Sequence, residues 1–85
     1  MELTILYFAR LREELGLSRE CVSPPAEICT LGQLRDWLIS RGEPWAQAFA
    51  LVQPVRIAQN QAVSADETLL RDGAEIAFFP PVTGG

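Results

Sequence analysis

One stretch of this 85-residue chain carries a complete helix signature, and segments of strand-like composition surround it. Thr30 and Gln33 have the spacing of a capping box, in which both side chains accept hydrogen bonds from free backbone N–H groups at the helix start. An apolar stripe at helical spacing follows, made of Leu31, Leu34, Trp37 and Leu38. Arg41-Gly42 closes the pattern, with Gly42 in the C′ position that favours glycine. We therefore expect the core to form against one principal helix.

Segments rich in β-branched and aromatic residues, or with alternating apolar residues, predict the strands of a sheet. They cover residues 3–8, 18–23, 51–59, 62–64 and 75–79. The first segment is apolar on both faces, which is typical of an interior strand, whereas Pro54 indicates an edge or a bulge in the third. Tight turns are expected at Asn60-Gln61 and at Asp72-Gly73.

Three weaker helical signals complete the pattern. Residues 9–15 suit a short amphipathic helix that Gly16 ends, and Pro44-Trp45 starts another that runs through Phe49. Ser64 and Glu67 repeat the capping-box spacing and predict a single helical turn. This order predicts one α+β domain over residues 1–85, in which a mixed sheet of about five strands packs on the principal helix.

The side-chain inventory excludes several classes of function. The chain has no His and no Lys, so it offers no imidazole base or metal ligand and no lysine for a Schiff base. Seven basic residues, all Arg, against eleven acidic ones give a net charge of −4. Nucleic acid and anionic membranes are therefore not expected as partners, and a protein partner is. The carboxylate pairs Glu13-Glu14 and Asp66-Glu67 are interpreted as helix-end charges.

Cys21 and Cys29 are the only thiols of the chain. Two thiols cannot complete a tetrahedral zinc site, so no metal is expected. Both are predicted to be small, mostly buried apolar side chains, and a catalytic or disulfide role is the alternative. No secretory signal is visible and no apolar run approaches the ~18 residues of a membrane span, so a cytoplasmic location is expected.

The C-terminus is the most promising place for chemistry. Phe78 and Phe79 tie the last strand to the fold or to a neighbour, and Pro80-Pro81 then fixes φ at two successive residues and forms a stiff stem. Residues 82–85 extend the chain by roughly 13 Å if fully extended. Because Gly84 and Gly85 carry no side chains, the terminal carboxylate can enter a narrow channel of another protein. Activation with ATP would give an acyl-adenylate, and a sulfur donor would convert it to a thiocarboxylate, a soft sulfur nucleophile.

The residues that end the chain, Asp72 to Gly85 with the sequence FFPPVTGG at the terminus, closely resemble the end of the small, sulfur-carrier subunit of molybdopterin synthase. Residues 6–16 look like the first strand and helix of the same family, and Asn60-Gln61 falls where that family has its Asn-Gln turn. The resemblance implies a ubiquitin-like β-grasp fold. It departs at Ala74, where Asp is common and which we interpret as a difference at the turn surface, and at Gln59, where an apolar residue is more usual.

The resemblance also implies a site and partners. An activating enzyme that uses ATP and Mg would adenylate Gly85, and a sulfur donor protein would supply the sulfur. The tail residues Val82, Thr83 and Gly84 would thread into the large catalytic subunit, with Phe79, Pro80 and Pro81 at the interface. Sulfur would pass there to cyclic pyranopterin monophosphate (precursor Z) in an assembly of two small and two large subunits. The chain itself would bind no cofactor, and the catalytic side chains would belong to the large subunit.

The sequence is also consistent with other functions. The chain could be a sulfur carrier for thiazole or cysteine synthesis, a ubiquitin-like modifier joined to target lysines, or an interaction module with an incidental tail. Arg10, Arg12 and Arg71 are candidates for contacts with acidic patches on partners, although surface arginines are more often simply solvated. Strand alternation places Phe78 and Phe79 on opposite faces, so Phe79, together with Val82, is favoured for an interface.

Overall fold

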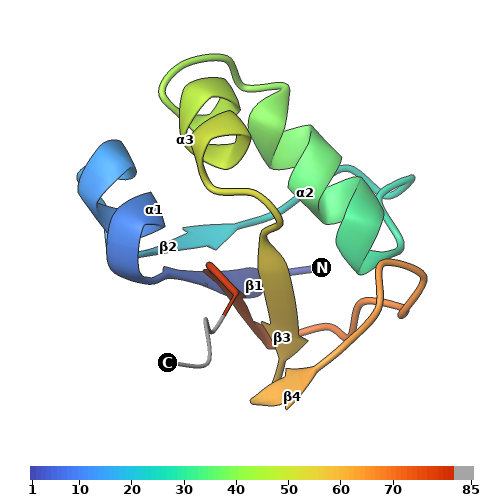
Figure 1. Cartoon of the computed structure of the whole chain (residues 1–85). Helices are drawn as coiled ribbons and strands as arrows, with labels where there is room; N and C mark the ends of the chain where they lie inside the picture. Colours follow the sequence, from blue (N-terminus) through green and yellow to red (C-terminus); the bar gives the residue numbers. More distant parts are fainter. Residues whose placement is uncertain (82–85) are drawn as a thin grey trace.

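The computed structural model describes residues 1–81, which form a five-stranded sheet with three helices over one face (Figure 1). The strands are β1 (Leu3–Tyr7), β2 (Arg19–Val22), β3 (Arg56–Gln59), β4 (Ala62–Val63) and β5 (Glu75–Phe79). The helices are α1 (Ala9–Leu15), α2 (Leu31–Ile39) and α3 (Trp45–Leu51). The predicted α+β class and the five-stranded mixed sheet are confirmed, with two shorter helices beside the principal one.

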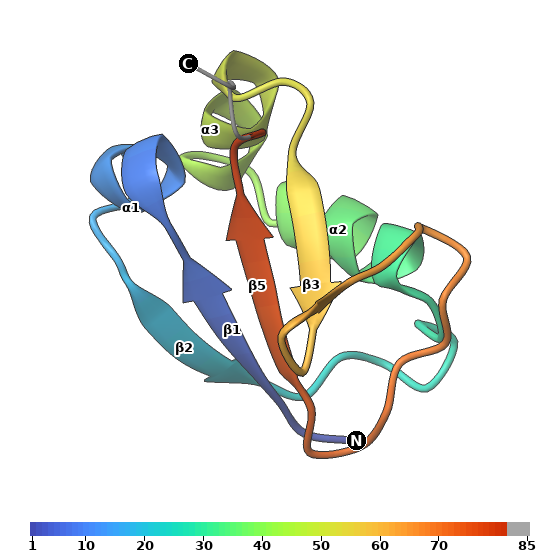
Figure 2. The same ribbon diagram turned by 60° about the horizontal axis from the view of Figure 1, so that its bottom comes forward.

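The sheet has the strand order β2-β1-β5-β3-β4, and its central pair is parallel. β1 pairs with β5 in parallel, while the three other pairings are antiparallel. The first strand is thus interior, as predicted. Because β1 and β5 run in the same direction, the end of β5 lies beside the start of α1, and α3 lies near it on the same face of the sheet (Figure 2).

Local signals set the helix ends. Thr30 and Gln33 form the predicted capping box, and Gly16 caps α1 with φ of 65°, a left-handed conformation that favours glycine. α2 ends earlier than predicted, at Ile39, with Ser40 as its C-cap, so Gly42 is not at C′. The backbone N–H groups of Arg41 and Gly42 bond to carbonyls three residues back, which tightens the chain into a turn.

Two other predictions are corrected. The expected strand over residues 51–59 begins only at Arg56, because Leu51 is the last residue of α3. Ser64 and Glu67 do not start a helix, and the Ser64 hydroxyl donates to the Ala62 carbonyl. The loop that follows caps the start of α2. The carbonyls of Asp66 and Thr68 accept hydrogen bonds from the N–H groups of Gly32 and Leu31, two donors that have no partner within the helix.

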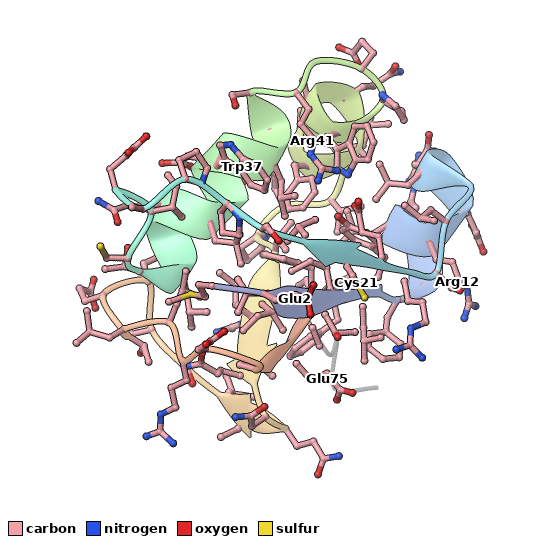
Figure 3. All side chains as sticks on the ribbon, turned by 180° about the vertical axis from the view of Figure 1, so that it is seen from behind. Glu2, Arg12, Cys21, Trp37, Arg41 and Glu75 are labelled. Carbon is pink, nitrogen blue, oxygen red and sulfur yellow. The ribbon has the colours of Figure 1, made fainter. Side chains whose placement is uncertain are left out.

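The core lies between the sheet and the three helices. Its largest fully buried side chains are Tyr7, Phe49, Phe78, Leu3, Ile5, Leu11, Leu31, Leu34, Leu38 and Ile76. Cys21 and Cys29 are exposed free thiols, which corrects the expectation that they are buried. Cys21 alternates with the buried Val22 on edge strand β2 and points to the other face, where its Sγ lies 4.0 Å from the Thr4 hydroxyl (Figure 3).

Gln59 and Ala74 are both buried, at 6% and 2% exposure. The Gln59 amide nitrogen donates to the Leu69 carbonyl, and its oxygen accepts from the Arg71 N–H, both at 3.0 Å. The buried amide is therefore paired and holds the loop before β5 in place. The prediction that Ala74 is a difference at the turn surface is wrong, since the residue is part of the core.

A polar cluster ties the helical layer to β2. The Arg41 guanidinium lies over the rings of Trp37 and Trp45, and Figure 3 labels Arg41 and Trp37. Arg41 donates to both carboxylate oxygens of Glu20 at 3.0 Å. Glu20 also accepts a 2.7 Å bond from the hydroxyl of Tyr7, which is 1% exposed. Desolvation by burial, together with this hydrogen bond, raises the pKa of Tyr7 well above its usual value.

Candidate functional site at the C-terminal stem

The structure describes only part of the predicted site. Val82, Thr83, Gly84 and Gly85 lie outside the described residues, so their predicted roles stay predictions. Phe79, Pro80 and Pro81 are described, and all three are partly exposed. These three residues are called the stem below, and with them the described part of the chain leaves β5.

β5, which leads into the stem, is paired with a strand on each side and covered by the helical layer on one face. β5 lies between β1 and β3, with Phe78 opposite Tyr7 on one side and Ile57 on the other. The Phe78 ring is fully buried and packs edge-on against Phe49, with ring centres 5.4 Å apart. The pairing continues past β1, since the Phe8 N–H donates to the Phe78 carbonyl at 3.1 Å. The stem thus starts from one of the most constrained strands of the fold.

Phe79 points to the face of the sheet that carries no helix. Phe78 is buried under the helices while Phe79 is only partly buried, so the predicted alternation is confirmed. Phe79 is opposite Arg56 of β3. Phe79 is therefore not one of the buried core residues.

An apolar surface adjoins Phe79 on this open face. The strand register places Leu6, Ala77, Ala58 and Val63 in one row across four strands. Phe8 continues the alternation of β1 in an extended conformation and is 43% exposed, while Val63 is 69% exposed. We call Leu6, Phe8, Val63, Ala77 and Phe79 the open-face patch. Contiguous exposed apolar surface of this kind marks sites of protein interaction.

Sequence reasoning missed Phe8 and Val63 as candidate contact residues. For Phe8 the signal was present in the alternation, because Leu6, two positions before it, faces away from the core. For Val63 there was no such signal, because both residues of β4 are exposed. What the sequence could not supply was the pairing of β4 with β3 and of β5 with β1, which brings the two residues to the same face as Phe79.

The charged candidates lie at the surface. Arg10, Arg12 and Arg71 are exposed, and Arg10 Nε lies 3.6 Å from Glu14 Oε1 one helical turn away. Asp66 Oδ2 accepts a 2.8 Å hydrogen bond from Arg35 and is thus part of an ion pair. Within residues 1–81, no group of three or more Cys, Asp or Glu is placed to hold a metal ion. None of the helices in this part of the chain could span a membrane.

Comparison with known proteins places the chain among sulfur carriers. The model of the ThiS family matches residues 5–85. The chain is 36% identical to the molybdopterin synthase sulfur carrier subunit of Haemophilus influenzae, over 98% of this chain and 99% of that protein. It is 37% identical to the subunit of the same name from Escherichia coli, over 95% and 96% of the two chains.

Solved structures show the same fold. The putative molybdopterin converting factor subunit 1 of Pyrococcus furiosus superimposes with a TM-score of 0.77 at 26% identity, over 96% of this chain and 99% of that one. The small archaeal modifier SAMP1 of Haloferax volcanii superimposes with the same score at 24% identity, over the whole of both chains. The fold is the ubiquitin-like β-grasp, as the resemblance implied.

Proposed function

The chain belongs to the ThiS family, and from this membership we propose that it is the sulfur carrier subunit of a molybdopterin synthase, with Gly85 as the residue that carries the sulfur. The observation that carries the proposal is the similarity over nearly the full length to sulfur carrier subunits, and the FFPPVTGG terminus, which resembles the end of such subunits, supports it. The side-chain inventory supports it, because a chain without His or Lys has few groups for catalysis other than its own carboxylate.

The chemistry proceeds in three steps. A Gly85 carboxylate oxygen attacks the α-phosphorus of ATP on the activating enzyme, which also binds Mg, and pyrophosphate leaves. Hydrosulfide supplied by a donor protein then attacks the acyl carbon, displaces AMP and loses its proton, which leaves a thiocarboxylate. In the large subunit the thiocarboxylate sulfur attacks a carbon of cyclic pyranopterin monophosphate and displaces the oxygen substituent of that carbon, which leaves as a phosphate oxygen or as water. A further water then cleaves the acyl–sulfur bond and restores the carboxylate. Two loaded carriers are used for each dithiolene.

The described residues support a docking role in this scheme. The open-face patch is apolar and adjoins the stem, so a protein that encloses the tail can bury the patch at the same time. Phe79, Pro80 and Pro81 then fix the direction in which Val82, Thr83 and Gly84 enter the partner. The partners are the large catalytic subunit, in an assembly of two small and two large subunits, and the activating enzyme. The exposed thiols of Cys21 and Cys29 fit a reducing cytoplasm.

Reconstitution tests the proposal. The carrier is incubated with the activating enzyme, ATP, Mg and a sulfur source, and is then mixed with the large synthase subunit and the pyranopterin precursor. We expect formation of the dithiolene product with the full chain, and none with a chain that lacks Gly84-Gly85 but has an unchanged far-ultraviolet circular dichroism spectrum. Equal product from the two chains contradicts the proposal. Conjugates to lysines of other proteins that resist reductant would identify a modifier instead.

A further inference from the structure

A shallow groove lies on the helix-covered side of the stem, away from the open-face patch. It has a volume of about 370 Å³ and is lined by Arg10, Leu51, Val52, Gln53, Pro80 and Pro81. We call these six residues the stem groove. Arg10 comes from α1, Leu51 is the last residue of α3, and Val52 and Gln53 follow it; both helices lie near the end of β5 (Figure 2).

The stem groove is apolar with one cation. Val52 is 5% exposed and forms the floor, whereas Leu51 is 47% exposed at the last residue of α3. The two prolines form one wall. Arg10 is the charged member: its side chain is 59% exposed, and its 3.6 Å contact with Glu14 is an exposed i,i+4 pair of the weak kind. Its guanidinium is therefore available to a carboxylate from outside.

The stem groove lies next to the point where the tail begins. Pro80 and Pro81 line the stem groove and also belong to the stem that precedes the tail. A protein that encloses the residues after Pro81 must therefore lie next to the groove. The stem has the open-face patch on one side and the groove on the other. A partner that contacts both surfaces holds the stem between them and limits the directions in which the tail can point.

From this arrangement we infer that the stem groove is a second contact site for the large synthase subunit and receives an apolar side chain of that subunit next to one of its carboxylates. The inference rests on the proposed function, which supplies the large subunit as the protein that encloses the tail. The apolar side chain packs against Leu51, Val52 and the prolines, and the carboxylate pairs with Arg10. The stem groove then contributes to specificity as well as to affinity, because a partner protein without this carboxylate would leave Arg10 without its ion pair.

Binding of the purified large subunit to the full chain, measured by isothermal titration calorimetry, tests the inference. Leu51→Asp places a carboxylate in the groove, and Leu69→Asp is its matched control, because Leu69 is 67% exposed and precedes the opposite end of β5. We expect Leu51→Asp to weaken binding roughly tenfold or more and Leu69→Asp to leave it unchanged. Melting curves verify that both variants are folded.

Arg10→Glu provides a second variant that does not depend on packing, since the side chain is mostly exposed. Its control is Arg71→Glu, an equal change of charge before the far end of β5. We expect Arg10→Glu to weaken binding roughly tenfold at low salt and less at high salt, because the lost contact is ionic. Arg71→Glu is expected to change affinity less than Arg10→Glu at both salt concentrations.

The outcomes separate the groove from the proposed function. A wild-type chain that transfers sulfur, with Leu51→Asp and Arg10→Glu binding the large subunit as tightly as their controls, overturns the groove inference alone. Weaker binding of these variants only to the activating enzyme overturns it as well. A wild-type chain that binds the large subunit but transfers no sulfur contradicts the proposed chemistry, while the four binding constants still decide on the groove.

Discussion

Arg41 joins the helical layer to the edge strand β2, and its removal tests how this small fold is held together. Its guanidinium carbon lies 5.1 Å from the ring centre of Trp37 and 4.7 Å from that of Trp45, and its Nη1 donates to both carboxylate oxygens of Glu20. The side chains of Arg41 and Glu20 are 24% and 19% exposed, so water screens this ion pair less than a fully exposed one.

The size of the effect follows from these contacts. A hydrogen bond to a charged group contributes about 1.5–3 kcal/mol, and a cation–π contact at a partly exposed site adds about 0.5–1 kcal/mol. Replacement by Ala leaves Glu20 able to contact water, which recovers part of the loss. Arg41→Ala is therefore expected to lower the free energy of unfolding by about 2–3 kcal/mol. For a domain of this size that corresponds to a fall in Tm on the order of 10–20 °C.

Urea and thermal unfolding followed by circular dichroism measure this change. Arg71→Ala is the matched control, because it removes an exposed guanidinium, and it is expected to change stability by less than about 0.5 kcal/mol. A double-mutant cycle of Arg41→Ala with Glu20→Gln isolates the ion pair, with an expected coupling of about 1 kcal/mol or more. Equal stability of Arg41→Ala and Arg71→Ala, or a coupling near zero, would refute the reasoning.

Three other perturbations test separate parts of the structure. The raised pKa of Tyr7, the one tyrosine in the chain, keeps this side chain protonated in the folded state at a pH where it loses its proton in the unfolded chain. The contribution of Tyr7 to the free energy of unfolding in urea is therefore expected to be constant below about pH 10 and to fall above it, and Tyr7→Phe is expected to lack this fall. Gln59→Leu leaves the Leu69 carbonyl and the Arg71 N–H without their partner and is expected to cost about 1–3 kcal/mol in urea unfolding, whereas the exposed Gln61→Leu changes little. Val63→Asp on the open-face patch is expected to weaken binding of the large subunit in calorimetry and to leave Tm unchanged, and tight binding by this variant contradicts docking through that face.

Local sequence signals predicted those parts of the fold that local interactions determine. The capping box at Thr30 and the left-handed cap at Gly16 depend on neighbours within a few residues, and both were found as predicted. The same spacing at Ser64 failed, because the carbonyls of the following loop are engaged with the start of α2, a contact that no local pattern encodes. The exposure of Cys21 follows from the phase of β2, which the buried Val22 sets and a mean burial preference for cysteine does not.

The candidate site divides in the same way. The terminal sequence alone indicates Gly85, because a Gly-Gly end on a double-proline stem is a feature of consecutive residues. The open-face patch and the stem groove draw residues from segments far apart in the chain, such as Phe8 with Val63 and Arg10 with Pro81. Both surfaces depend on the strand order and on the place of α1 and α3 beside β5, so they emerged only from the structure.

The mass of the C-terminal peptide tests the sulfur carrier proposal most directly. The chain is incubated with the activating enzyme, ATP, Mg and a sulfur source and is then cleaved after Arg71, which releases residues 72–85, a peptide without Cys, Met or Trp whose oxidation could imitate the change. We predict a mass gain equal to the replacement of one oxygen by one sulfur, located at Gly85 by fragmentation. An unchanged peptide, obtained with an activating enzyme that loads another carrier under the same conditions, contradicts the proposal.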